Sequence, residues 1–119
     1  MKVLIDTNFF LIPLQFNIDI FSELERIMSA EGKYELSTIS PVLTELGARG
    51  PPGEKAGELI KLNKVKIYEF KATDTDSGLV EFAEAGDFLC TQDKELKRLA
   101  RAKGIRIITM VSQNHLEEV

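Results

Sequence analysis

The stretch Val3-Leu4-Ile5-Asp6-Thr7-Asn8, near the start of the chain, is a short apolar run that stops at an acid. A run of this length is too short for a helix and is typical of a strand buried on both faces, as in a parallel sheet. Asp6 would then lie at the carboxyl edge of the sheet, where ligands bind in open α/β folds. Asp is also a favoured N-cap residue, so a purely structural role for Asp6 stays open at this point.

Further strand candidates alternate with helical patterns along the rest of the chain. After Lys2–Ile5, the strand-like runs are Tyr34–Ser37, Val65–Phe70, Asp87–Thr91 and Ile105–Thr109. Helical spacing of apolar residues marks Ile18–Ala30, a helix opened by Ser40-Pro41, Glu54–Leu62, Ser77–Glu84 and Lys94–Lys103. This alternation predicts an α/β protein whose parallel sheet of five strands carries helices on both faces. The tail Val111–Val119 is expected to form a last helical turn or to fray.

Size and composition limit the class of protein. The 119 residues suffice for one domain, 1–119, with one core. The hydrophobic share of 44% and charged share of 29% are typical of soluble globular proteins. No apolar run approaches the roughly 20 residues of a membrane helix, and the N-terminus does not resemble a signal peptide. The single cysteine, Cys90, excludes an internal disulfide and a multi-cysteine zinc site, so we expect a cytoplasmic protein.

The distribution of charge is more informative than its total. The net charge of −4 does not by itself indicate nucleic-acid binding. Between Lys94 and Arg106, however, six basic residues stand against one acid. This run is either a solvated helix face or a patch that faces phosphates. In the second interpretation, the candidates for holding an RNA backbone are Lys94, Lys97, Arg98 and Arg101.

Four acids are predicted to meet at the carboxyl edge of the sheet. Two follow strands and two lie in the first turns of helices that begin at that edge: Asp6, Asp93, Glu45 and Asp76. Carboxylates gathered in this way raise one another's pKa unless a cation offsets their charge. Their oxygens suit Mg²⁺ or Mn²⁺, ions that orient a phosphodiester and its attacking water. The sequence therefore favours a divalent metal site.

Each acid also has a structural interpretation when it is taken alone. Asp93 is placed to cap the helix Lys94–Lys103, and Asp76 competes with Asp74 and Ser77 for the cap of the preceding helix. Glu45 would suit an exposed helix position. Other chemistries lack their residues: the one histidine has no nucleophile partner, and no glycine-rich phosphate loop follows the first strand.

Taken in order along the chain, these motifs resemble a PIN domain over nearly the whole length. The residues that carry the resemblance are Leu4 to Asn8, Glu45, Asp76 and the run Thr91-Gln92-Asp93-Lys94-Glu95-Leu96. The resemblance implies a three-layer α/β/α sandwich with a five-stranded parallel sheet, and a Mg²⁺- or Mn²⁺-dependent endoribonuclease acting on single-stranded RNA. It implies an acidic quartet of Asp6, Glu45, Asp76 and Asp93, oriented by Asn8 and Thr91. It also implies a possible homodimer.

Two branches of the family are similar to the chain in different ways. The run from Thr91 to Ile105 is similar to PIN nucleases of ribosomal-RNA processing, whereas the compact size is similar to VapC toxins, which implies an antitoxin protein as partner. At the third acid, Asp76-Ser77-Gly78-Leu79 departs from the alanine-rich toxin pattern and leaves Asp74 open as an alternative. The competing function is a catalytically inactive PIN-like module that binds RNA or a protein.

Overall fold

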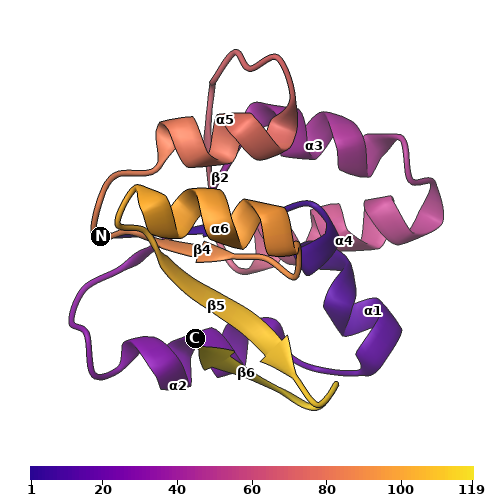
Figure 1. The fold of residues 1–119 in the computed structure, drawn as a ribbon. Coiled ribbons are helices and arrows are strands. Elements are labelled where there is room, and N and C mark those ends of the chain that lie inside the picture. The colour runs from indigo at the N-terminus through magenta and orange to yellow at the C-terminus, as the bar shows by residue number, and fades with distance from the viewer.

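The computed structural model describes all 119 residues and contains one six-stranded sheet with the strand order β3-β2-β1-β4-β5-β6 (Figure 1). In chain order the elements are β1 (Lys2–Ile5), the 3-10 helix η1 (Asn8–Leu11), α1 (Ile12–Phe16), α2 (Ile20–Met28), β2 (Glu35–Ile39), α3 (Ser40–Gly47), α4 (Pro51–Leu62), β3 (Lys66–Tyr68), α5 (Thr75–Phe82), β4 (Phe88–Cys90), α6 (Lys94–Ala102), β5 (Arg106–Val111) and β6 (His115–Glu118).

Strand β1 lies in the middle of the sheet, with parallel neighbours on both sides. Leu4 is in register with Ser37 of β2 on one side and with Leu89 of β4 on the other. The β1 residues Val3, Leu4 and Ile5 are completely buried, because helices cover both faces of the sheet. The predicted α/β class is confirmed, and Asp6 follows the central strand at its carboxyl end.

The helices form two outer layers. On one face α5 and α6 pack against each other over the sheet, and on the opposite face α2 packs against β6 (Figure 1). Helices α3 and α4 pack together, and α4 also contacts η1. The aromatic residues Phe9 and Phe10 of η1 and Phe88 of β4 are among the largest fully buried side chains, so the short segment after β1 is anchored in the core. No helix in the structure is both long and apolar enough to span a membrane.

The sheet has one strand more than the sequence predicts. The segment expected to be helical or frayed contains β6, which pairs antiparallel with β5 and places Met110 opposite Leu116. Only Leu116 of this short strand is buried, so the alternating pattern of a strand is too brief to recognise. The turn before β6 has Ser112 and Gln113 at φ values of 54° and 56°, although turns of this kind usually carry Gly or Asn.

Two other boundaries differ from the predicted ones. Helix α4 begins at Pro51, immediately after Gly50 at φ 64°, because prolines are tolerated in a first turn whose N–H groups have no helical partner. Ser40, the predicted N-cap of α3, instead accepts a hydrogen bond at Oγ from the Phe70 N–H at 3.2 Å. This contact ties the start of α3 to the segment that follows β3.

Candidate active site

Asp6 is buried at the carboxyl end of β1, and two hydrogen bonds orient its carboxylate. Its Oδ2 accepts from the Thr91 hydroxyl at 2.6 Å, and its Oδ1 accepts from the Asn8 N–H at 3.2 Å. Burial raises the pKa of Asp6; the two hydrogen bonds oppose this shift, and the charges of Glu45 and Asp93 add to it. Thr91, which is itself fully buried, joins the ends of β1 and β4 through this contact.

Glu45 reaches the same edge from α3. The buried Thr7 hydroxyl donates a short hydrogen bond to Glu45 Oε1, so the residue after Asp6 holds the second acid. The sequence did not identify this role for Thr7, although its position directly after the strand-ending acid was the available signal. The backbone contact from Asn8 to Asp6 and the side-chain contact from Thr7 to Glu45 place these two carboxylates in one region.

The structure separates Asp74 from Asp76. Asp74 is the N-cap of α5: its Oδ1 accepts from the Ser77 N–H and its Oδ2 from the Ser77 hydroxyl, both at 2.9 Å. These hydrogen bonds lower the pKa of Asp74. Asp76 lies in the first turn of α5, where partial burial, and then repulsion from Asp6, Asp93, Glu45 and Asp74, raise its pKa to about 6. Of the two acids at the start of α5, Asp76 is therefore the one whose pKa is raised by the charges of Asp6, Glu45 and Asp93.

Asp93 combines a structural contact with proximity to the other acids. Its Oδ1 accepts from the Leu96 N–H at 2.8 Å and caps α6, while its own N–H donates to the Thr91 hydroxyl at 3.1 Å. Its Oδ2 accepts no hydrogen bond from the chain, so one carboxylate oxygen is free for a ligand. Its charge contributes to the raised pKa of both Asp6 and Asp76.

Gln92 fixes the turn that carries Thr91 and Asp93, a role that the sequence did not reveal. Its Oε1 accepts from the Thr109 hydroxyl and from the Met110 N–H, both at 2.6 Å. These contacts fasten the β4–α6 turn to β5. No motif marks this residue in the sequence, because its partners lie on a strand 17 and 18 residues further along the chain.

The donor chemistry of the four acids fits a hard divalent cation. Their donors are all carboxylate oxygens, and none of the four forms an ion pair with Lys, Arg or His. In the side-chain positions of this structure, no three of them come close enough to surround one ion. Asp76 is exposed and its carboxylate accepts no hydrogen bond from the chain, so rotation of this side chain is available to bring it closer to the fixed Asp6.

The basic residues of α6 fall into two groups. Lys97 lies between Lys94 and Arg101 along α6, and burial, followed by repulsion from Arg101 and Lys94, lowers its pKa. The charge of Asp93 acts in the opposite direction on the pKa of Lys97, so Lys97 lies near that acid. Arg98 differs, because its guanidinium forms an ion pair with Glu95 on the same helix.

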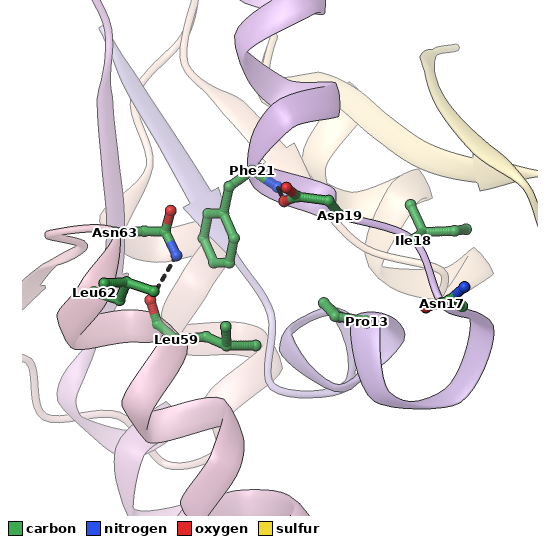
Figure 2. Close-up of a pocket in the computed structure, with 8 residues that line it drawn as sticks. All are labelled: Pro13, Asn17, Ile18, Asp19, Phe21, Leu59, Leu62 and Asn63. Carbon is green, nitrogen blue, oxygen red and sulfur yellow. Dashed lines mark hydrogen bonds between the residues drawn. The ribbon is translucent and has the colours of Figure 1, made fainter.

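Two hollows in the surface have different relations to the acids. The cavity in Figure 2, of about 370 Å³, lies between the α1–α2 connection and the end of α4 and is lined by Phe21, Leu59 and Leu62, among others, but by none of the four acids. An open groove of about 780 Å³ runs instead between α3 and the β3–α5 connection, with Glu45 and Asp74 in its lining. The second hollow adjoins the candidate site.

Comparison with known proteins agrees with the fold described above. Residues 3–113 match a family described as "PIN like domain". The chain belongs to the PIN-like domain family. The resemblance drawn from Asp6, Glu45, Asp76 and the Thr91–Leu96 run is thereby confirmed.

Individual PIN proteins are similar over almost the entire chain. Ribonuclease VapC4 of Methanocaldococcus jannaschii is 24% identical over 126 residues, which cover 98% of this chain and 95% of the relative. The solved structure of the PIN domain endonuclease Utp24 superposes with a TM-score of 0.83 and 26% identity, covering 98% of this chain and 90% of that one. A domain of a functionally unknown protein from M. jannaschii shares the fold, with a TM-score of 0.51 and 20% identity.

Proposed function

We propose that this PIN protein is a metal-dependent endoribonuclease that cleaves single-stranded RNA. The observation that carries the proposal is that four carboxylates, from four different segments, lie near enough to repel one another around the carboxyl edge of β1 and β4, without a counter-cation. Such a group is costly for a fold unless a cation compensates it. Similarity to Ribonuclease VapC4 supports RNA as the substrate, and similarity to the endonuclease Utp24 supports cleavage within the strand.

Asp6, Glu45, Asp76 and Asp93 would hold Mg²⁺ or Mn²⁺. When bound there, such an ion supplies an activated water and offsets charge on the phosphoryl oxygens. The chain's own residues prepare the site: Thr91 and the Asn8 N–H fix the direction of the Asp6 carboxylate, and Thr7 fixes Glu45. Groups already held in position lose little freedom when a ligand arrives.

The α6 cations would hold the RNA backbone beside the acids. Lys97 lies near Asp93, and Lys94, Lys97 and Arg101 form no ion pair with a carboxylate. They are therefore available to bind phosphates, and a local basic group of this kind is compatible with a net charge of −4. Arg98 contributes less, since Glu95 already occupies its guanidinium.

Cleavage of a labelled single-stranded RNA in the presence of Mn²⁺ tests the proposal. We expect Asp6→Asn to reduce the cleavage rate by about 100-fold or more, the scale of loss when a group acting on the transition state is removed. Asp74→Asn is the matched control, because asparagine also caps helices and Asp74 is placed outside the quartet. Cleavage by Asp6→Asn at the wild-type rate would contradict the proposed site.

Partner proteins and the oligomeric state stay predictions. A VapC-like role predicts an antitoxin protein as partner, whereas a ribosomal-RNA-processing role predicts none. Co-expression of the chain with the reading frame next to its gene, followed by affinity purification, distinguishes the two roles. Light scattering during size-exclusion chromatography tests the predicted homodimer.

A further inference from the structure

Arg49 lies beside the acids, although it is absent from every motif discussed above. Its Nη2 donates to Asn8 Oδ1 at 2.8 Å. The Asn8 N–H in turn donates to Asp6 Oδ1, so one asparagine connects the guanidinium to the most buried of the four carboxylates. The side chain of Arg49 is exposed, and this is the only hydrogen bond it makes within the chain.

The segment after β1 is contacted by one side chain of α3 and by one from the turn that follows this helix. Glu45 lies in α3 and Arg49 lies two residues after its end. They contact two consecutive residues of the segment after β1: Thr7 binds Glu45, and Asn8 binds Arg49. Glu45 and Arg49 form no ion pair with each other.

The guanidinium of Arg49 therefore has no carboxylate partner to neutralise its charge. Three of the five arginines, Arg26, Arg98 and Arg106, are ion-paired with glutamates, whereas Arg49 is not. One of its five N–H donors is used by Asn8, and the other four have no partner within the chain. A planar guanidinium with free donors is suited to bidentate binding of a phosphate.

We propose that Arg49 is a substrate-positioning residue that binds a backbone phosphate of the RNA on the α3 side of the acids. The inference rests on the proposed function. Helix α3 follows β2 and helix α6 follows β4, and these strands flank β1 in the sheet. Arg49 and the α6 cations therefore approach Asp6 from different sides. An RNA strand bound by both Arg49 and the α6 cations crosses the four acids. This position places one of its phosphodiester groups over them.

RNA binding as a function of salt concentration tests this role. The measurement uses a short fluorescent single-stranded RNA and proteins that carry Asp6→Asn, so that binding is observed without cleavage. We expect Arg49→Ala to weaken binding about tenfold, as for loss of a charge-assisted hydrogen bond. We also expect the slope of log K against log salt to fall by about 0.7, the contribution of one phosphate contact on a single strand. Lys33→Ala, which removes an exposed lysine away from the site, is the matched control and leaves the slope unchanged.

Two further measurements separate a phosphate contact from a merely structural one. With Asp6 intact, Arg49→Lys is expected to keep the charge and the salt slope but to lower kcat/KM about tenfold, because lysine lacks the bidentate geometry. Calorimetric Mn²⁺ binding is expected to be unchanged in Arg49→Ala. If Arg49→Ala binds RNA with the wild-type affinity and slope, and only its melting temperature falls, the inference is overturned. If the chain with native Arg49 neither binds nor cleaves RNA, the proposed function fails and this inference fails with it.

Discussion

The charge of Asp76 opposes folding at neutral pH. Its pKa in the folded protein is raised from 3.8 to about 6, so the folded state binds its proton more tightly than the unfolded state does. The stability associated with this group is therefore complete below about pH 4 and is lost as the pH rises through 6. A bound cation would relieve the same repulsion, which couples metal affinity to pH.

Replacing Asp76 with asparagine tests this linkage. We expect Asp76→Asn to raise the free energy of unfolding at pH 7.5, without metal, by about 1 kcal/mol, a value reduced for solvent screening because the side chain is exposed. At pH 5, where the native carboxyl is largely protonated, the gain should shrink. Urea denaturation at both pH values measures the difference. A gain that is equal at the two pH values, or a loss at pH 7.5, would contradict the linkage.

At the level of elements, the position of α3 depends on one close approach between helices. A Cβ atom added to Gly53, in the first turn of α4, would lie 1.7 Å from the carbonyl oxygen of Leu46 near the end of α3. Only glycine allows the two helices to meet there. Since α3 carries Glu45 and the turn after it carries Arg49, this contact also sets the geometry of the candidate site.

Alanine substitutions at two glycines of α4 test the packing. We expect Gly53→Ala to lower the free energy of unfolding by about 3 kcal/mol, because the clash is with backbone and α4 has to shift. Gly57→Ala is the control in the same helix: nothing lies within 4 Å of its added Cβ, so it should stabilise by about 0.5–1 kcal/mol. Chemical denaturation compares the two. Equal stabilities for both variants would show that α3 and α4 do not require the close approach.

A strand or helix can be predicted from this sequence when its run of apolar residues is long enough to recognise. The strands β1 and β4 are predictable because they are uninterrupted apolar runs, and the positions of Asp6 and Asp93 beyond the ends of these strands follow from the same runs. By contrast, β6 has a single buried residue, Leu116, and its turn lacks glycine. Contacts made by single polar side chains across the fold, such as those of Gln92 and Arg49, leave no periodic trace in the sequence.

At the scale of the whole molecule, the two edges of the sheet differ in whether their acidic side chains are paired with a cation. At the amino edge Asp87 is buried beside β1 and accepts from the Lys2 and Glu84 N–H groups, both at 2.9 Å, and from Lys2 Nζ at 3.0 Å. Burial alone would raise its pKa, but these partners lower it overall. At the carboxyl edge Asp6, Glu45 and Asp93 also accept hydrogen bonds, but none of the four acids is paired with a cation. The buried acid at the amino edge is paired with a lysine, whereas the acids at the carboxyl edge have no cation from the chain beside them.

Loss of Asp87 should therefore destabilise the fold without altering the candidate site. We expect Asp87→Ala to lower the free energy of unfolding by about 3 kcal/mol, since it leaves Lys2 and two N–H groups unpaired. Because the folded pKa is lowered, the wild-type advantage should diminish as the pH falls towards acid. Glu25→Ala, at an exposed helix position, should change stability by no more than about 0.5 kcal/mol. Urea titrations from neutral to acidic pH measure all three proteins.

The outer edge of β6 is occupied by side chains of α2. The Leu116 N–H donates to Glu23 at 2.9 Å, and the Leu116 carbonyl accepts from Arg26 at 2.8 Å. An edge strand with free backbone groups is a template for pairing with another chain. Here the middle of the edge is already hydrogen-bonded, so the sheet cannot be extended by a foreign strand on this side. A protein partner on this side therefore has to bind to helix surfaces. The same contacts oppose aggregation by pairing of β6 with a strand of another chain.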